Sequence, residues 1–226
     1  MIIQKITMTH LNKGNEKNKV MQRFDIINAI IEKNNQNSYL EIGVCNPNEC
    51  FDKINCEYKD SVDPGYENPS NPVKFKMTSD DFFNQLSKQI KYDIIFIDGL
   101  HLSHQVKKDI NNSLKHLSKG GYIILHDCNP PSLFHARENY LVNGVIHQWN
   151  GTVWKAIYEI RTHRKDLNVK VVDTDWGIGI INYNEKNNTK LVEFDNPFYE
   201  YNKMSENRVR DLGLISIEDF NRWLIK

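Results

Sequence analysis

The sequence predicts a doubly wound α/β fold, in which helices cover both faces of a largely parallel sheet. First, strand-like and helix-like segments alternate along residues 16–127. Second, the run YDIIFIDG at residues 92–99 is apolar between polar ends, which is typical of a central parallel strand buried on both faces. Third, residues 169–183 form two strand-like runs joined by an Asp-Trp-Gly turn, which predicts an antiparallel hairpin at the sheet edge.

Local spacing predicts the elements of the first half of the chain. Apolar residues recur on one helical face over residues 16–33, and the polar run NNQN then ends that helix. A second helix should begin at Pro47, because Asn46 can cap it and Glu49 can complete a capping box. The other elements predicted here are strands at 39–44, 58–63 and 73–77 and a helix at 79–90 that is capped by Ser79 or Asp80.

The second half alternates once more and then becomes irregular. A stripe of apolar residues predicts a helix over residues 104–117, and the sequence SKGG ends it before a strand at 122–127. Residues 128–150 have no clean periodicity, and long loops of this kind usually act as lids or binding loops. A helix at 152–161, the hairpin and a tail at 184–226 with a closing amphipathic helix complete the chain.

The composition excludes several classes of protein. Lys plus Arg and Asp plus Glu number 29 each, so no net field attracts nucleic acid or an anionic membrane. No apolar run approaches the roughly 20 residues that cross a bilayer, and the first residues lack a signal-peptide core, so we expect a cytoplasmic protein. The four cysteines have no C-x-x-C spacing and are expected to be reduced thiols. A chain of 226 residues is expected to form one domain.

The segment YLEIGVCNPNEC raises the question of which ligand it binds. A strand, a glycine turn and a helix start form a nucleotide-binding entrance, but Cys45 and Asn48 stand where dinucleotide sites carry further glycines. Those glycines let the backbone approach a pyrophosphate, so a ligand without phosphate, such as S-adenosylmethionine, needs only Gly43. Asp63 lies twenty positions after Gly43 and can bind the ribose hydroxyls, while Glu41 is an acidic partner near the turn.

Five segments resemble class I S-adenosylmethionine-dependent methyltransferases in their order and spacing. They are YLEIGV, SVDP, KMTSDDFF, FIDGLH and LSKGGYIILHDCNPP, and the resemblance covers residues 38–183. They are most similar to the small bacterial branch of sugar and natural-product O-methyltransferases. The resemblance implies a Rossmann-like sheet of about seven strands whose last strand is antiparallel.

The resemblance also implies which residues bind the cofactor. Local structure offers an alternative for some of them, because Ser79 and Asp80 can be helix caps and Asp63 can be a turn aspartate before Pro64. The implied roles are Glu41 and Gly43 at the methionyl end, Asp63 at the ribose, and Thr78, Ser79 and Asp80 beside the adenine.

The chemistry is expected at the carboxyl edge of the sheet, where open α/β sheets bind their ligands. Asp98 ends the fourth predicted strand and Asp127 the fifth, so the two carboxylates should meet. The similar catechol-type methyltransferases carry a metal-binding aspartate, a basic residue three positions later and an Asp-Asn pair at these strand ends. By that resemblance Asp98, Asp127 and Asn129 are candidate Mg²⁺ ligands, although Cys128 separates the last two, and Asp98 also borders the cofactor.

Methyl transfer needs an aligned acceptor oxygen and removal of its proton, because the sulfonium already activates the methyl group. His101 is the predicted base, since an imidazole titrates near neutral pH. His104 and His126 are reserves, and a capping or exposed histidine is the alternative interpretation of His101. Asp127 is predicted either to act in catalysis or to be a structural acceptor.

The sequence therefore predicts an S-adenosylmethionine-dependent O-methyltransferase of a small molecule, with a bacterial glycan or nucleotide-sugar precursor as the acceptor class. An NAD-dependent oxidoreductase or epimerase and a non-catalytic ligand-binding domain of the same fold are the alternatives. We expect no nucleic-acid or membrane partner, and a homo-oligomer is left open. The residues that can line the acceptor pocket, or merely anchor its loops, are Arg137, Tyr140, His147, Trp149 and Trp176.

Overall fold

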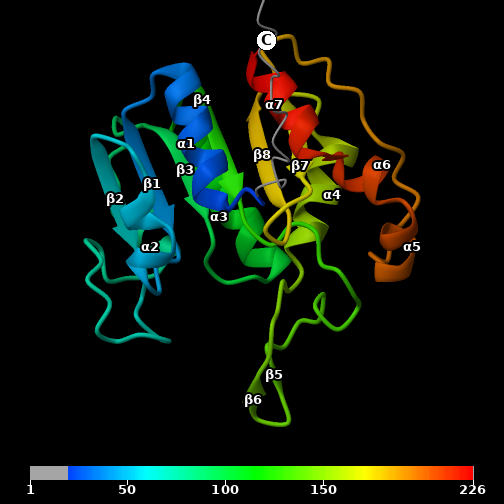
Figure 1. The fold of residues 1–226 in the computed structure, drawn as a ribbon, viewed down its shortest axis with the longest axis horizontal. Coiled ribbons are helices and arrows are strands. Elements are labelled where there is room, and N and C mark those ends of the chain that lie inside the picture. Colours follow the sequence, from blue (N-terminus) through cyan, green and yellow to red (C-terminus); the bar gives the residue numbers. More distant parts are fainter. Residues whose placement is uncertain (1–19, 226) are drawn as a thin grey trace, which may run out of the picture.

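The computed structural model describes residues 20–225, and its centre is a seven-stranded sheet in the order β2-β1-β3-β4-β8-β7-β9 (Figure 1). β8 runs antiparallel to both of its neighbours, β4 and β7, and the other pairs are parallel. The predicted α/β sheet with a late antiparallel strand is therefore confirmed. The strands are β1 (Ser38–Ile42), β2 (Tyr58–Val62), β3 (Tyr92–Ile97), β4 (Leu117–Leu125), β7 (Leu167–Val172), β8 (Ile178–Tyr183) and β9 (Leu214–Ile215).

Helices cover both faces of this sheet, so the molecule has three layers (Figure 1). Successive side chains of a strand point to opposite faces, so Ile94 packs with one helical layer and Ile95 with the other. One layer holds α1 (Arg23–Asn34) and α7 (Ile217–Ile225), and the other holds α2 (Ser79–Gln85), α3 (Ser103–Lys115), α4 (Val153–His163), α5 (Tyr201–Glu206) and α6 (Arg208–Leu212).

The first helix is shorter than predicted. Residues 20–22 are not helical, and α1 begins at Arg23, where the carboxylate of Asp25 accepts from the backbone N–H of Gln22 over 2.9 Å. Val20 lies within the predicted helix but precedes α1, and it is 63% exposed. The rest of the predicted stretch from residue 16 lies outside the described residues. At the other end Asn35 adopts a left-handed conformation and ends α1 as predicted.

The predicted helix after Gly43 was wrong. The chain forms two separate 3₁₀ turns there, η1 (Pro47–Glu49) and η2 (Phe51–Lys53), instead of a continuous α-helix. The amide of Asn46 donates to the side chain of Glu49 and caps no backbone group. Short 3₁₀ turns are frequent as connectors, and Pro47 starts one of them here.

The predicted strand at residues 73–77 was also wrong, and the cap of the next helix was misplaced. Only Phe75 pairs, in a single bridge with Val62, because the backbone N–H of Lys74 bonds to the hydroxyl of Ser61 instead. α2 is capped by Thr78, one residue before the predicted caps, and it ends at Gln85 rather than at residue 90.

The C-terminal tail contributes β9, the seventh strand of the sheet. β9 pairs with β7 and was not predicted, so the hairpin of β7 and β8 does not form the outer edge. β4 already begins at Leu117 and includes the SKGG run that was expected to precede it. Within the irregular stretch after β4, the short strands β5 (Leu141–Val142) and β6 (Val145–Ile146) form a hairpin that projects from the body (Figure 1).

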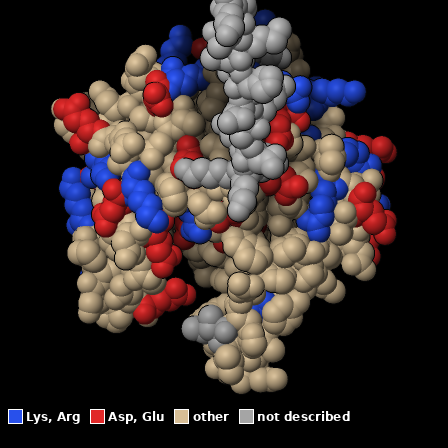
Figure 2. All heavy atoms as spheres, viewed as in Figure 1, with Lys and Arg blue, Asp and Glu red and all other residues tan. Residues whose placement is uncertain are grey.

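Three further features concern the surface charges, the cysteines and the hydropathy of the helices. Acidic and basic side chains are interspersed on the face shown in Figure 2, as the equal charge counts suggest. All four cysteines are free, and Cys50 and Cys128 are buried. Among residues 20–225 no helix is long and apolar enough to span a membrane.

Candidate active site

The turn after β1 brings the ends of β1 and β3 into contact. Gly43 has a φ of +90°, and a Cβ atom added to it would lie 2.2 Å from the carbonyl oxygen of Asp98. Only glycine tolerates both the left-handed backbone and this close approach. The single glycine of the turn is therefore required by the neighbouring strand end, which it places beside the turn.

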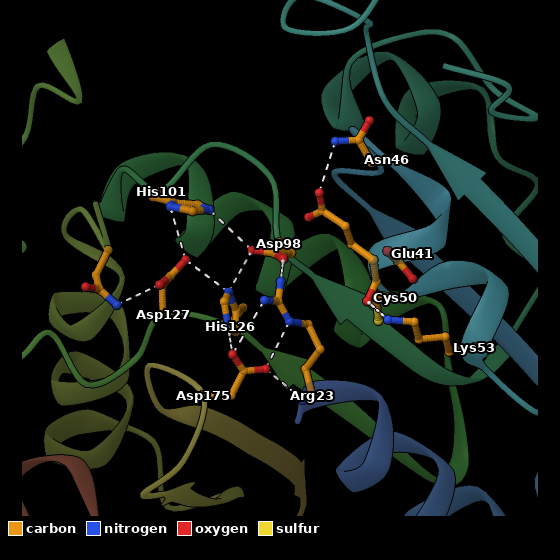
Figure 3. Close-up of polar contacts among 12 residues, drawn as sticks. Arg23, Glu41, Asn46, Cys50, Lys53, Asp98, His101, His126, Asp127 and Asp175 are labelled. Atoms are coloured by element: carbon orange, nitrogen blue, oxygen red, sulfur yellow. Dashed lines mark hydrogen bonds and ion pairs between the residues drawn. The ribbon is translucent and has the colours of Figure 1, made fainter. Parts of the chain in front are cut away.

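Asp98 and Asp127 follow β3 and β4 and hold His101 between them (Figure 3). Nε2 of His101 lies 3.3 Å from Oδ1 of Asp98, and Nδ1 lies 3.2 Å from Oδ2 of Asp127. Asp127 has a φ of +60°, a conformation that aspartate tolerates better than most residues. Asp98, His101 and Asp127, which were predicted from their positions after two parallel strands, therefore lie together in the structure.

His126 lies beneath this trio and joins it to a third carboxylate. Its Nδ1 is 3.3 Å from Oδ1 of Asp98 and 3.1 Å from Oδ2 of Asp127. Its Nε2 is 3.4 Å from Oδ1 of Asp175, in the turn between β7 and β8, without the alignment of a hydrogen bond. His126 is 6% exposed, so its contacts with these carboxyl groups are buried.

Arg23 closes the cluster from the start of α1 (Figure 3). Its Nη1 lies 3.0 Å from Oδ2 of Asp98, and its Nε lies 3.1 Å from Oδ2 of Asp175. The backbone N–H of Arg23 also donates to Asp175, over 2.8 Å, so this carboxylate sits at the positive end of α1. Three segments far apart in sequence therefore converge on one group of charges.

These charges shift the pKa values of the buried groups. Burial opposes ionisation of Asp98, but the charge of His126 and the hydrogen bond from His101 hold the pKa of Asp98 well below its usual range. His126 and Arg23 likewise lower the pKa of Asp175 to about 2 despite its burial. Burial disfavours the imidazolium forms, yet the facing carboxylates raise the pKa of His101 and raise that of His126 much further. Two imidazoles and one guanidinium thus face three carboxyl groups.

The end of the loop after β4 fixes the orientation of His101 and Asp127. Asn150 is fully buried and donates from Nδ2 to Oδ1 of Asp127 over 2.6 Å. The indole of Trp149 stacks on the His101 ring, with centroids 5.1 Å apart and planes 24° apart. Gly151 has a φ of +64°, and a Cβ atom on it would lie 2.1 Å from the carbonyl oxygen of His101. The imidazole therefore has little freedom to turn.

The residues predicted at the methionyl and ribose ends lie at the ends of β1 and β2. Glu41 is 3% exposed and accepts a 2.5 Å hydrogen bond from the hydroxyl of Tyr39, and burial raises its pKa to about 8. Oδ1 of Asp63 accepts hydrogen bonds from the backbone of Gly65, over 2.6 Å, and from Nδ2 of Asn71, over 3.0 Å. Oδ2 of Asp63 has no hydrogen-bond partner among the described residues. Asp63 is thus a turn aspartate with one oxygen still available.

The residues predicted beside the adenine make contacts within the protein. Thr78 accepts from the backbone of the first turn of α2. Nε2 of Gln105 donates to the hydroxyl of Ser79 over 3.2 Å and to Oδ1 of Asp80 over 3.1 Å. Lys108 pairs with Asp80 at 3.2 Å. These contacts hold α2 against α3, which supports a structural role for the polar atoms of Ser79 and Asp80.

A divalent cation would find three donors in the cluster, but not the three that were predicted. Donor atoms of Asp98, His101 and Asp127 lie within 4.8 Å of one another. The amide of Asn129 instead donates to Asp173 over 3.0 Å and accepts from Arg208, away from the cluster. Two carboxylates with an imidazole suit Mn²⁺, Fe²⁺ or Zn²⁺ better than Mg²⁺, which prefers oxygen ligands.

Of the residues expected around the acceptor, Trp149 stacks on His101, whereas Arg137 has another role. It donates to four backbone carbonyls of its own loop and is therefore a loop anchor. Tyr140 packs on Trp149 with ring centroids 5.6 Å apart. His147 packs on a neighbouring phenylalanine of the loop, and Trp176 is 36% exposed beside the cluster residue Asp175.

Three residues of the cluster were not predicted from sequence. Arg23, Asn150 and Asp175 belong to three different segments, and only the fold brings them together. From sequence, Asp175 was recognised only as part of the hairpin turn; in the structure its φ of +42° gives it an unusual backbone conformation. The reserve base His104 is exposed on α3, away from these contacts.

Comparisons with known proteins add to this geometry. Residues 30–128 match a family model described as a methyltransferase domain. A proposed O-methyltransferase from Klebsiella pneumoniae is 13% identical, covers 70% of this chain and 78% of its own, and has a TM-score of 0.50. A proposed caffeoyl-CoA O-methyltransferase from Staphylococcus aureus is 17% identical, with coverage of 74% and 86% and a TM-score of 0.50. At these identities the two structures show a shared fold. No curated protein matches the sequence.

Proposed function

We propose that the chain is an S-adenosylmethionine-dependent methyltransferase that methylates a hydroxyl oxygen of a small molecule, a proposal supported by the match of residues 30–128 to a methyltransferase-domain model. The observation that carries this proposal is the position of His101. Its ring is held between Asp98 and Asp127 at the carboxyl edge of the sheet, where open α/β folds bind their ligands. We further propose that the whole chain is one such domain, since its tail supplies β9 to the same sheet and α7 to the layer of α1.

The cofactor is proposed to lie across the ends of β1 and β2. Gly43 and the acidic Glu41 would border its methionyl end, and the unpartnered Oδ2 of Asp63 would accept from the ribose hydroxyls. A carboxylate at this position forms strong charge-assisted hydrogen bonds with a ribose. The adenine would lie towards the start of α2, where it would pack on backbone and apolar groups, because the polar atoms of Ser79 and Asp80 have partners.

His101 is proposed to remove the acceptor proton at its Nε2 atom. Nδ1 faces two acceptors, Oδ2 of Asp127 and the carbonyl oxygen of Trp149 at 3.4 Å, so Nδ1 carries a hydrogen in the neutral ring. Nε2 is then the free acceptor, once the hydroxyl of the substrate takes the place of its contact with Asp98. Asp127 holds the ring in this tautomer and stabilises the imidazolium that forms.

A divalent metal ion at this site is the alternative to a histidine base. Asp98, His101 and Asp127 would hold it, so His101 would be a ligand and not the base, and the metal would polarise an acceptor hydroxyl and lower its pKa. If a metal is required, EDTA should abolish turnover, and Mn²⁺ should restore it better than Mg²⁺. Binding can be followed without turnover by titrating the metal-free protein with Mn²⁺ and recording electron paramagnetic resonance. Asp98→Asn should abolish the bound signal, whereas binding by Asp98→Asn equal to that of the wild type would exclude this ligand set.

The acceptor class is proposed to be a bacterial glycan or nucleotide-sugar precursor. The half-exposed Trp176 offers a flat apolar surface beside the cluster, on which a sugar ring can stack. A mass-shift screen of nucleotide sugars, with simple phenols as the comparison set, should show a gain of one methyl group on a sugar. Methylation of the phenols alone would reject the sugar class.

Calorimetry provides the first test of the proposed function. S-adenosylhomocysteine should bind to the wild-type protein, and NAD should not, because the turn after β1 lacks the glycines that admit a pyrophosphate. Tight binding of NAD with no response to S-adenosylhomocysteine would favour an oxidoreductase or epimerase instead.

A further inference from the structure

The loop between β2 and α2 ties two strand ends together through one buried asparagine. Asn71 is 4% exposed, and its Nδ2 donates to the carbonyl oxygen of Val44, over 2.9 Å, and to Oδ1 of Asp63, over 3.0 Å. Both partners can only accept, so the network fixes which end of the amide carries the hydrogens. Asn71 therefore links the glycine turn after β1 to the carboxylate after β2.

The same loop holds the glycine turn at a second point. Nδ2 of Asn68 donates to the carbonyl oxygen of Cys45 over 2.9 Å. The loop itself is fastened by Lys76, whose Nζ lies 2.5 Å from the carbonyl oxygen of Pro69. Consecutive carbonyls of the turn thus accept hydrogen bonds from side chains of this one loop, although the turn lacks the further glycines of dinucleotide sites.

The carboxylate of Asp63 is oriented by these contacts. Its Oδ1 receives two donors, the backbone N–H of Gly65 and the amide of Asn71, which prevents the carboxylate from rotating. Its Oδ2 has no partner among the described residues and is the oxygen left for a ligand. Oδ1 of Asn71 is itself buried without a partner among those residues, which costs stability, so loop stability alone does not account for an amide at this position.

We propose that Asn71 is a positioning residue for S-adenosylmethionine, which acts by holding Asp63 with Oδ2 towards the ribose hydroxyls. The inference rests on the proposed function, in which Asp63 binds the ribose. Asn71 touches no reacting atom. It acts on the cofactor through the carboxylate of Asp63, while its hydrogen bond to the carbonyl oxygen of Val44 anchors the amide itself.

A double-mutant cycle on cofactor affinity tests this role. Calorimetry with S-adenosylhomocysteine should show that Asn71→Ala weakens binding roughly tenfold, the effect of one hydrogen bond to a charged group. Asp63→Ala should weaken binding by at least as much. In the Asp63→Ala background the Asn71→Ala change should cost little more, because the residue through which Asn71 acts is gone. Ser70→Ala, an exposed position in the same loop, is the matched control and should bind like the wild type.

The possible outcomes separate this inference from the function on which it rests. If the wild type does not bind S-adenosylhomocysteine, the proposed function itself fails. If the wild type binds and Asn71→Ala binds equally well, or if the two losses simply add, Asn71 only supports the loop and the inference is overturned. Should Asn71→Ala not fold in a thermal melt, Asn71→Ser keeps one donor and takes its place in the cycle. A loss of the same size with methylthioadenosine, which lacks the amino-acid end, would place the effect at the ribose.

Discussion

The two halves of the carboxyl edge are held in different ways. The cofactor half comprises the ends of β1 and β2 and the start of α2, and the acceptor half comprises the cluster around His101. In the cofactor half, Asp63 and its partner Asn71 are 8 positions apart. In the acceptor half, Arg23 and Asp175 are 152 positions apart. A substitution in the cofactor half should therefore act locally, whereas one in the acceptor half should disturb several elements together.

The largest effect is expected from His101 in the acceptor half. His101→Ala should lower kcat by roughly 10²–10⁴-fold, the usual contribution of a general base, and leave S-adenosylhomocysteine affinity almost unchanged. Burial favours the neutral ring, but Asp98 and Asp127 outweigh it and raise the pKa of His101 above 6.5. The base must be neutral to act, so the wild-type rate should still rise with pH above 6.5, and the residual rate of the mutant should not.

His104→Ala is the matched control for this experiment. His104 is exposed on α3 and only three positions further along the chain, so its replacement should leave both kcat and the pH profile unchanged. The role assigned to His101 would be rejected if His101→Ala kept the wild-type rate and pH profile while His104→Ala lost them.

The second effect concerns the link between α1 and the acceptor half. Arg23→Ala should lower the free energy of unfolding by up to roughly 3 kcal/mol, because two largely buried carboxylates lose their shared cation. In a chain of this size each kcal/mol corresponds to about 2–4 °C in the melting temperature. The exposed pair of Arg222 with Asp219 provides the control, and Arg222→Ala should change stability by less than about 1 kcal/mol. Equal melting temperatures for the two variants would mean that Arg23 does not hold the cluster together.

The same comparison explains how much of the site the sequence could predict. Asp98, His101 and Asp127 follow from the rule that carboxyl ends of parallel strands share an edge, because that rule needs only the strand order. Arg23 could not be found in this way, since its partners are 75 and 152 positions away and no local pattern connects them.

The errors in the predicted fold have a related cause. Asn46 and Pro47 are local signals, and they do not distinguish an α-helix from the 3₁₀ turns that the short path to β2 allows. Residues 73–77 have a composition typical of a strand. The backbone N–H of Lys74 donates to the hydroxyl of Ser61, however, and only Phe75 pairs with β2. The sheet was predictable because burial imposes a pattern on every central strand, whereas these segments depend on single side-chain contacts.

The third effect is a pH dependence that belongs to the cofactor half. Burial raises the pKa of Glu41 from 4.5 to about 8. Between these values the folded protein keeps a proton that the unfolded chain has lost, so the stabilisation is complete below 4.5 and declines as the pH rises towards 8. The loss is about 1.4 kcal/mol for each pH unit. Glu41→Gln stays neutral, so its free energy of unfolding from urea titrations at pH 6 and pH 8 should lack this decline. A decline as steep in Glu41→Gln as in the wild type would show that Glu41 is already ionised at pH 6.

The smallest effect is expected from Thr78, which distinguishes a helix cap from a cofactor contact. Its Oγ1 accepts from the backbone N–H of Asp81 over 3.1 Å and donates to the carboxylate of the same residue over 2.7 Å, so its single hydrogen is already in use. Thr78→Ala should therefore cost about 1 kcal/mol of stability, the usual value of an N-cap, and leave S-adenosylhomocysteine affinity unchanged. Thr78→Ser keeps the hydroxyl and should retain most of the stability. If Thr78→Ala instead melts like the wild type but binds the cofactor more weakly, the hydroxyl of Thr78 contacts the adenine. Its role in the cofactor half would then be to bind the ligand and not to cap α2.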